Sequence, residues 1–322
     1  MNLQILGTGS ALPKEVLTNK QLESIVETTD EWVKERTGIA QRHVSTGETV
    51  ASLATDAAKK ALDAAGKSAE DVELIIVATC SPELALPCVA CQVQAEIGAS
   101  KAVAFDLNAA CSGFLFALNT AYSYFSSGLY KNAVIIGAEV LSKIIDWTDR
   151  GTCILFGDGA GAVYVEANNE LPDNYKFVQY ANGSKGMVLT CGLRDLDNPL
   201  HKEELMKKYV WMDGREIFQF AVRQVSACIE ELLEKANVAK ENIDYYVLHQ
   251  ANARIIEGIS KRLKEDLSKF PTNVEHVGNM SSAAIPVLLD ESIKNGTVKK
   301  GQTLVLSGFG AGLTYGASVI TL

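Results

Sequence analysis

Short apolar runs rich in Val and Ile alternate along this chain with longer Ala-rich stretches of helical character. Runs that are apolar almost throughout are typical of strands in a sheet covered on both faces. We therefore predict strands at residues 72–79, 102–107, 133–137, 243–248 and 303–306. Strands that alternate with helices in this way indicate an α/β fold.

Part of the pattern occurs twice. The segments TCILFGDGAGAVY (152–164) and TLVLSGFGAGLTY (303–315) share Thr, Leu, Tyr and a Gly-x-Gly-Ala-Gly run at matching places. Upstream, residues 62–77 resemble residues 233–248 in pattern only. Repeated segments in the same order predict two similar α/β halves, 1–170 and 171–322, around one cleft. A chance coincidence of Gly-rich strand ends is the alternative.

Composition narrows the class of protein. Hydrophobic residues make up 47% and charged residues 21% of the 322 residues, which excludes a disordered chain. Because 39 acidic residues outnumber 30 Lys and Arg, neither nucleic acid nor an anionic membrane is expected as the main partner. Residues 1–13 lack a basic leader and a long apolar core, and no apolar stretch reaches membrane-spanning length, so a cytoplasmic protein is expected.

Seven scattered cysteines indicate reduced, mostly buried thiols. Cys111 differs from the others because it lies in NAACSGF, between a predicted strand and a predicted helix. A thiol at a helix N-terminus is expected to have a lowered pKa and to act as a nucleophile. A buried structural cysteine is the alternative.

Two further side chains stand where predicted elements end. His249 directly follows the strand predicted at 243–248, as a catalytic imidazole or a hydrogen-bonded core histidine would. Asn279 lies in a small-residue loop that we place after a strand and before a helix beginning near Ser281. Its amide can donate to a developing oxyanion, or it can simply form a turn or cap.

Other motifs are less informative. The glycine clusters at 157–161 and 308–312 match neither nucleotide-binding pattern and are better explained by close backbone approach between strands. Cys88 and Cys91 form a single CxxC without a second pair, so no metal site is expected.

Six segments, taken together and in order, closely resemble the β-ketoacyl-acyl carrier protein synthase III family of the thiolase superfamily. They are TTDEWVKERTGI (28–39), NAACSGF (108–114), DRGTCILFGDGAGA (149–162), HQANARI (249–255), GNMSSAAIP (278–286) and GFGAGLTYG (308–316). The resemblance implies a thiolase-like fold whose duplicated α/β halves form α-β-α-β-α layers. It also implies a homodimer that needs no cofactor beyond its thioester substrates.

The resemblance assigns a catalytic triad to Cys111, His249 and Asn279, and an oxyanion hole to the backbone N–H groups of Cys111 and Ala311. Cys111 would take an acyl group from acyl-CoA. His249 and Asn279 would then support decarboxylative condensation with malonyl-acyl carrier protein, which starts fatty-acid synthesis. Asn279 favours an initiating enzyme, since chain-elongating relatives carry a second His there.

Binding residues are implied as well. For coenzyme A they are Thr28, Trp32, Arg36, Arg150, Gly214 and Asn252; for the acidic carrier protein they are Arg254, Lys261 and Arg262. Leu86 would reach into the acyl pocket of the partner in the dimer. The alternatives are a related condensing enzyme of secondary metabolism, a hydroxymethylglutaryl-CoA synthase using Glu83, or a non-catalytic scaffold that binds carrier protein.

Overall fold

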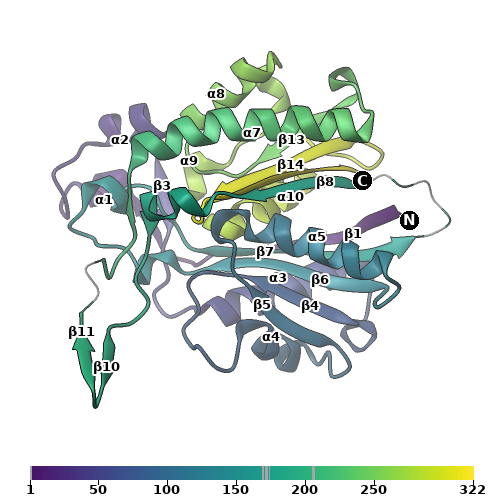
Figure 1. Ribbon diagram of the computed structural model, residues 1–322, viewed down its shortest axis with the longest axis horizontal. Coiled ribbons are helices and arrows are strands. Elements are labelled where there is room, and N and C mark those ends of the chain that lie inside the picture. Colours follow the sequence, from purple (N-terminus) through teal and green to yellow (C-terminus); the bar gives the residue numbers. More distant parts are fainter. Residues whose placement is uncertain (1, 169, 171–172, 174, 205–206) are drawn as a thin grey trace.

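A five-stranded sheet formed by the first part of the chain is one of two main sheets in the computed structural model (Figure 1). The structure describes residues 2–168, 170, 173, 175–204 and 207–322. The strand order is β1-β7-β6-β4-β5, with β4 parallel to β5 and β6. The strands are β1 (Asn2–Ala11), β4 (Leu74–Ala78), β5 (Val103–Leu107), β6 (Asn132–Glu139) and β7 (Gly159–Asn168).

The second main sheet has the strand order β8-β15-β14-β13, which corresponds to β1-β7-β6-β4 of the first sheet. In both sheets a parallel pair, β4–β6 or β13–β14, is followed by an antiparallel neighbour, β7 or β15. The strands are β8 (Lys176–Ala181), β13 (Tyr245–Leu248), β14 (Thr303–Gly310) and β15 (Thr314–Thr321). No described strand corresponds to β5 in this sheet, so the repeat is incomplete.

Helices complete a five-layered structure (Figure 1). The middle layer holds α5 (Gly113–Ser126) and α10 (Ala284–Lys294), whose buried side chains share one apolar core with both sheets. The outer layers are α3 (Val50–Ala65) and α4 (Val89–Ile97) on the first sheet, and α7 (Gly214–Ala236) and α8 (Ala253–Leu263) on the second. This is the expected α-β-α-β-α arrangement.

Small residues set how closely these layers approach. A Cβ on Gly7 of β1 would fall 2.2 Å from the Ala61 carbonyl oxygen of α3, and α3 itself faces the sheet with buried alanines. On the other face, a Cβ on Gly161 of β7 would fall 2.6 Å from the Val287 nitrogen of α10. Gly161 of the first glycine cluster therefore serves close approach to a helix, whereas Gly310 of the second approaches the turn that holds Cys111.

All five strands predicted from apolar runs are present, with ends shifted by at most two residues or, for β14, extended to Gly310. The stronger of the two sequence repeats is misaligned with the structure, however. Residues 303–310 form β14, whereas the matched residues begin in a short helix, α6 (Arg150–Cys153). The weaker match is the structural one, because 62–77 and 233–248 both run from a helix end through a 3₁₀ turn into β4 or β13.

A second internal likeness lies in the middle layer. A 3₁₀ turn precedes each central helix: η2 (Ala110–Ser112) before α5 and η7 (Ser281–Ala283) before α10. Each turn begins with a residue in the left-handed region, Ala110 at φ 47° and Ser281 at φ 48°. Non-glycine residues adopt this conformation only at an energetic cost, so both turns are held by their surroundings.

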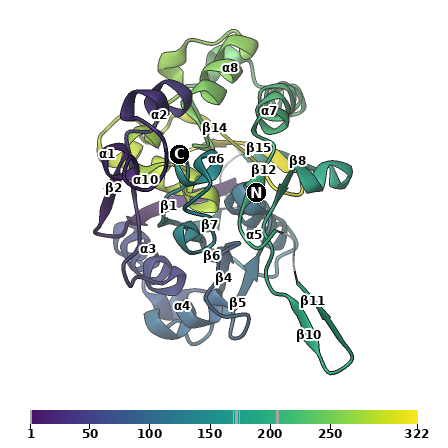
Figure 2. The same ribbon diagram turned by 90° about the vertical axis from the view of Figure 1, so that its left-hand side faces the viewer.

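The remaining elements decorate this core. An arm of paired strands stands away from the body beside the first sheet (Figure 2). Its strands are β10 (Leu196–Asn198) and β11 (His201–Glu203), whereas β9 (Leu189–Thr190) and β12 (Trp211–Met212) pair with each other within the body. Next to α8 lies α2 (Asp30–Thr37), which contacts α1 (Asn19–Leu22). The pair of strands β2 (Val16–Thr18) and β3 (Gln41–His43) adjoins α1, and α9 (Val274–Val277) packs on β3. Within the described ranges, no helix combines the length and apolarity needed to cross a bilayer.

Candidate active site

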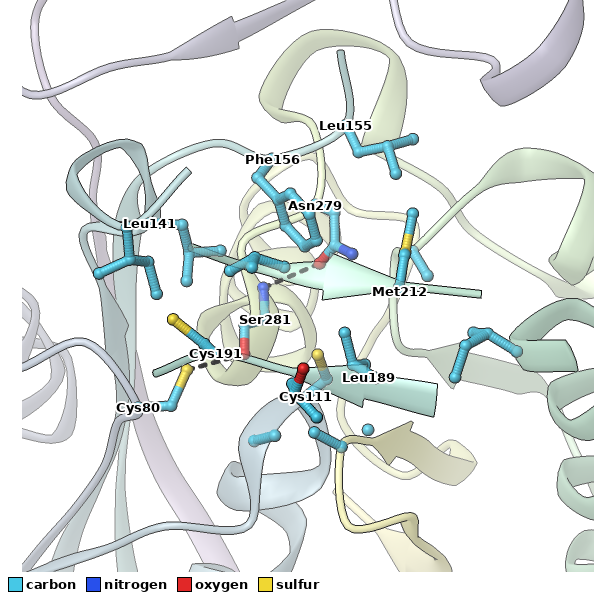
Figure 3. Close-up of a pocket in the computed structure, with 18 of the residues that line it drawn as sticks. Cys80, Cys111, Leu141, Leu155, Phe156, Leu189, Cys191, Met212, Asn279 and Ser281 are labelled. Carbon is cyan, nitrogen blue, oxygen red and sulfur yellow. Dashed lines mark hydrogen bonds between the residues drawn. The ribbon is translucent and has the colours of Figure 1, made fainter. Parts of the chain in front are cut away.

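A cavity of about 410 Å³ opens where strands of both main sheets end. Cys111, His249 and Asn279 all line it, although they are far apart in the sequence. Figure 3 shows Cys111 and Asn279 among the lining side chains. Cys111 follows β5, His249 follows β13, and Asn279 precedes η7. The topology therefore brings together the three side chains that the sequence singled out.

Cys111 occupies the turn between β5 and α5. The Asn108 side chain accepts a hydrogen bond from the Ala110 N–H at 3.1 Å, and the Ser112 hydroxyl donates to the Ala109 carbonyl at 2.8 Å. These local bonds stabilise the strained turn and leave Cys111 9% exposed, with its side chain in the cavity. The predicted strand, turn and helix around this cysteine are confirmed.

The prediction of a lowered pKa for the Cys111 thiol is wrong. Burial raises the pKa of Cys111 to about 12, and the nearby Glu139 carboxylate adds to the increase, whereas a hydrogen bond from Ser281 opposes it. A helix N-terminus favours a thiolate, but desolvation dominates here. The resting nucleophile is therefore a thiol and needs hydrogen-bond donors when its charge forms.

His249 is buried at the end of β13, where its backbone N–H donates to the Ser307 carbonyl of β14 at 2.8 Å. Its ring meets the Phe309 ring edge-on, with centroids 5.3 Å apart. Burial lowers the pKa of His249 to about 3, so the imidazole is neutral near pH 7. Its Nδ1 has no hydrogen-bond partner within the described structure.

The lack of a hydrogen-bond partner for Nδ1 indicates which tautomer His249 adopts. A buried N–H without an acceptor is rarer and costlier than an acceptor without a donor. The neutral ring is therefore best accommodated with its proton on Nε2, which makes His249 a hydrogen-bond donor to a group in the cavity.

Asn279 has a fixed amide orientation. Its Oδ1 accepts the backbone N–H of Ser281 at 2.9 Å, shown as a dashed line in Figure 3. Its backbone exchanges hydrogen bonds with Leu155 and Gly157, each at 2.9 Å. Because Oδ1 is occupied by a backbone donor, the amide NH₂ is the group left to face a ligand. The expected strand before Asn279 is wrong: α9 ends at Val277, and Gly278 lies between; the helix after it, with Pro286, is confirmed.

The end of β14 brings Gly310 and Ala311 to the same cavity as Cys111. A Cβ placed on Gly310 would fall 2.5 Å from the Cys111 nitrogen, so the end of β14 is packed directly on the nucleophile turn. The next residue, Ala311, lines the cavity, and its N–H has no acceptor within the described part of the chain.

The residues expected to bind coenzyme A divide into two groups. Gly214 and Asn252 line the cavity, whereas Trp32, Arg36 and Arg150 form a cluster outside it. The Arg150 guanidinium lies 4.7 Å from the Trp32 ring centroid, and that of Arg36 lies 5.7 Å from it. The Asn252 amide donates to the Arg36 carbonyl at 3.1 Å and so connects the two groups.

Thr28 adds a polar group to the Trp32 cluster. Its hydroxyl is buried and has no partner within the described residues. Arg150 is held by a 2.9 Å hydrogen bond to the Glu27 carbonyl and covers Trp32, so a purine can stack there only after Arg150 moves. The cluster has a free hydroxyl, an aromatic face and two cations, which suits an adenine nucleotide.

The remaining predicted residues are exposed. Arg254, Lys261 and Arg262 lie on α8; Lys261 is 3.9 Å from Glu257, whereas Arg254 and Arg262 form no ion pair with any described residue. Leu86 is 86% exposed and lies outside the cavity. Glu83 also lies outside it and pairs with Lys143 at 2.6 Å.

The prediction of free cysteines is confirmed, although Cys91 and Cys191 are exposed. Cys88 and Cys91 begin α4 as an isolated thiol pair, and no cluster of three potential metal ligands occurs among the described residues. Sequence reasoning missed two other cavity residues, Cys80 and Ser281. Ser281 follows Asn279 by two positions, but only the turn η7 reveals that its side chain contacts Cys80 at the cavity.

A thiolase-like fold with a cysteine, a neutral histidine and an oriented amide around one cavity defines a condensing acyltransferase. Models of the family 3-oxoacyl-[acyl-carrier-protein (ACP)] synthase III match residues 105–186 and, for its C-terminal part, 233–322. The chain belongs to this family.

Three relatives illustrate the relationship. The β-ketoacyl-[acyl-carrier-protein] synthase III of Clostridium beijerinckii is 48% identical over 99% of both chains. The crystal structure of 3-oxoacyl-[acyl-carrier-protein] synthase III from Aquifex aeolicus superposes with a TM-score of 0.92 at 44% identity, covering both chains fully. The priming β-ketosynthase of the R1128 polyketide pathway has a TM-score of 0.93 at 31% identity, covering 100% of this chain and 96% of its own.

Proposed function

We propose that this protein catalyses the first condensation of fatty-acid synthesis, joining an acyl group from acyl-CoA to malonyl-acyl carrier protein. The observation that carries the proposal is the single cavity shared by Cys111, His249 and the oriented Asn279 amide. Full-length relatives bear the corresponding name at 48% identity. The products are 3-ketoacyl-carrier protein, coenzyme A and carbon dioxide.

In the first half-reaction, the Cys111 sulfur attacks the thioester carbonyl carbon of acyl-CoA. The carbon–sulfur bond to coenzyme A breaks, and the thiol proton of Cys111 finally resides on the departing coenzyme A thiol. Negative charge develops on the carbonyl oxygen, where the backbone N–H groups of Cys111 and Ala311 can stabilise it.

In the second half-reaction, malonyl-carrier protein replaces coenzyme A. Its thioester oxygen accepts hydrogen bonds from His249 and from the Asn279 amide, so the enolate formed when carbon dioxide leaves is stabilised by two neutral donors. The enolate carbon attacks the acyl carbonyl on Cys111, and the bond to sulfur breaks. The departing Cys111 thiolate takes up one proton from solvent, which restores the thiol, and with this proton the step balances without an added oxidant or reductant.

The two substrates need different surfaces. Coenzyme A would stack its adenine between Trp32 and Arg150, and Arg36 would meet a phosphate. Its pantetheine arm would pass Asn252 and Gly214 into the cavity, with Thr28 near the channel or its mouth. The acidic carrier protein would dock on α8, where Arg254 and Arg262 are free of ion pairs with described residues and Lys261 is exposed beside them.

We also propose that the protein is cytoplasmic and forms a homodimer. Each subunit would consist of two similar halves, residues 1–170 and 171–322. The support for the dimer is β5, an edge strand of the first sheet whose Val103 is 47% exposed, and the neighbouring Leu86. Unpaired edges are rarely left open, and pairing of two β5 strands would cover both. Leu86 would then reach the acyl pocket of the partner.

The proposal is tested by mass spectrometry of the intact protein after incubation with acetyl-CoA. The wild type should gain one acetyl group on Cys111, and Cys111→Ala should gain none. Variants His249→Ala and Asn279→Ala should still be acetylated but should lose condensation by at least about 100-fold. Acetylation that survives Cys111→Ala would contradict the mechanism.

A related condensing enzyme of secondary metabolism is the second candidate, favoured by the likeness to the R1128 priming ketosynthase. Product analysis with a panel of acyl-CoA primers and malonyl-carrier protein separates the two. The hydroxymethylglutaryl-CoA synthase alternative loses support because Glu83 pairs with Lys143 outside the cavity. A protein with no acetylated residue would revive the scaffold alternative.

A further inference from the structure

Arg42 of β3 is a buried arginine that the mechanism above does not use. Its side chain has no exposed surface, and its Nε has no hydrogen-bond partner within the described residues. Burial lowers the pKa of Arg42 to about 10, so the guanidinium is charged near pH 7, although no described carboxylate pairs with it. Burying a charge without a counter-ion is costly, so such an arginine is expected where its donors fix something that an apolar residue would leave loose.

The guanidinium of Arg42 joins three segments of the chain. Its Nη1 donates to the Leu17 carbonyl at 3.2 Å and to the Asn19 Oδ1 at 2.9 Å, and its Nη2 donates to the Ile154 carbonyl at 2.7 Å. Only arginine offers a rigid planar fork of donors, because lysine carries a single point charge on a flexible stem. Arg42 therefore fixes the segment that begins at Ile154 relative to β2 and α1.

The segment after Ile154 holds the backbone of Asn279. The Leu155 carbonyl accepts the Asn279 N–H, and the Gly157 N–H donates to the Asn279 carbonyl, each at 2.9 Å, so that Phe156 and Asn279 pair as in a parallel sheet. Figure 3 shows Leu155 and Phe156 beside Asn279 at the cavity. The residue that Arg42 binds is therefore the one just before the three that hold Asn279.

The aliphatic part of Arg42 packs against the same region. A Cβ placed on Gly157 would fall 3.1 Å from the Arg42 Cβ, and so would a Cβ placed on Gly278. Gly157 donates to Asn279, and Gly278 directly precedes it in the chain. Both segments that meet at Asn279 thus pass directly against one side chain.

Asn19 anchors the other end of the guanidinium. It is fully buried, and its amide nitrogen donates to the Ile39 carbonyl at 2.7 Å and to the Asp30 Oδ1 at 3.0 Å, which leaves its Oδ1 to face Arg42. Because Asp30 begins α2, the anchor of Arg42 belongs to a folded helix.

We propose that Arg42 is a positioning residue for condensation: through its contacts with residues 154–157, it sets the place of the Asn279 amide in the cavity. The inference rests on the proposed function, in which this amide donates to the thioester oxygen of malonyl-carrier protein. Arg42 itself lies outside the cavity lining. Its loss therefore lowers the rate of condensation and leaves transfer of the acyl group to Cys111 intact.

The test measures two rates: acetyl transfer from acetyl-CoA to Cys111, by mass spectrometry of the intact protein, and single-turnover condensation of the acetylated protein with malonyl-carrier protein. Arg42→Met should load at close to the wild-type rate but condense about 100-fold more slowly, because ångström-scale displacement of a catalytic group has effects of this size. Arg42→Lys keeps the charge but not the fork, so it should fold even if Arg42→Met does not, and should condense about tenfold more slowly.

A double variant separates positioning of Asn279 from general destabilisation. If Arg42 acts through Asn279, adding Arg42→Lys to Asn279→Ala should slow condensation no further, whereas independent effects would multiply. Tyr175→Phe is the control for loss of a buried polar group, because its hydroxyl bonds Asn119 and Ser318 outside the cavity lining. It should change neither rate.

Three results would overturn the inference: wild-type condensation in the Arg42 variants, equal slowing of loading and condensation in them, or multiplied losses in the double variant. A wild type that forms no 3-ketoacyl product refutes the proposed function itself. An active wild type with unaffected Arg42 variants refutes this inference alone.

Discussion

At the residue scale, the neutral state of His249 affects the acid stability of the fold as well as catalysis. Its pKa of about 3 in the folded protein lies below the unfolded value near 6.5. The unfolded chain therefore binds more protons than the folded chain as the pH falls through this interval, and folding loses stability toward acid. Above pH 6.5 His249 is neutral in both the folded and the unfolded chain, so it no longer makes folding stability depend on pH.

We predict that His249→Asn reduces the acid sensitivity of folding. From pH 6.5 to 4, the wild type should lose roughly 1.4 kcal/mol per pH unit relative to the variant, about 3 kcal/mol in all. Urea unfolding at a series of pH values measures this difference, provided that both proteins have the same denaturant slope.

His276 supplies a control with the opposite sign. A hydrogen bond from its ring to Glu291 raises the pKa of His276, so its contribution to stability is present at low pH and lost as the pH rises through the folded value. His276→Asn should therefore cost more stability at pH 5 than at pH 8. The assignment of a neutral His249 would be refuted if both variants changed the pH profile in the same direction.

The residues that sequence reasoning missed have a shared physical reason. Cys111 and His249 could be singled out because each stands at the end of a recognisable element. Cys80 and Ser281 have no such mark, since their importance arises from a positive φ at Ser281 and from the buried Glu139 behind Cys80. The wrong expectation for the Cys111 pKa has the same origin: a helix start can be read in a sequence, but the extent of desolvation cannot.

At the element scale, the approach of β14 to the turn η2 decides the position of the nucleophile. Gly310 leaves no space for a side chain next to the Cys111 nitrogen. We predict that Gly310→Ala displaces η2 and lowers the rate of acyl loading about 100-fold, because ångström-scale misplacement of a reacting group has effects of this size. The measurement is the rate of acetyl transfer to Cys111 by mass spectrometry.

Gly183→Ala is the matched control, because a Cβ at Gly183 meets nothing within 4 Å. It should load acetyl groups at the wild-type rate. Loading at that rate in Gly310→Ala would mean that β14 does not position the cysteine.

Elements were predicted well where their apolar character was continuous. The five strands and the helix after Cys111 needed only local patterns. The short helix α9 was mistaken for a strand because Val274 and Val277 are β-branched residues that pack in the core, a case where tertiary packing overrides local preference. Similarly, the Gly-rich repeat was misaligned because its glycines occur where other parts of the chain approach the backbone closely, and these places differ between the two sheets.

At the scale of the whole molecule, the net charge of −9 makes the basic residues of α8 the exception. An acidic carrier protein is repelled by most of the surface, so Arg254 and Arg262 gain importance for where it docks. We predict that Arg254→Glu with Arg262→Glu raises the KM for malonyl-carrier protein at least about tenfold at low salt. Steady-state kinetics at 50 and 500 mM salt should show that the difference in KM between the variant and the wild type is smaller at high salt, because surface charges are screened.

Lys59→Glu is the control for net charge, since Lys59 lies exposed on α3 in the opposite outer layer. It changes the charge by the same sign but should leave KM within about twofold of the wild type. An equal effect of both changes would show that overall charge, and not a docking site on α8, governs carrier-protein use.

The two strained turns of the middle layer, η2 and η7, occupy corresponding places before α5 and α10. If η2 and η7 descend from one ancestral turn, Ala110 corresponds to Ser281, and Cys111 corresponds to Ser282. In the second copy that position is a serine whose hydroxyl contacts the Glu139 carboxylate and the Ala78 carbonyl, each at 2.8 Å. One turn thus carries the candidate nucleophile, whereas the serine at the corresponding position of the other turn ties η7 to β4 and β6 of the first sheet.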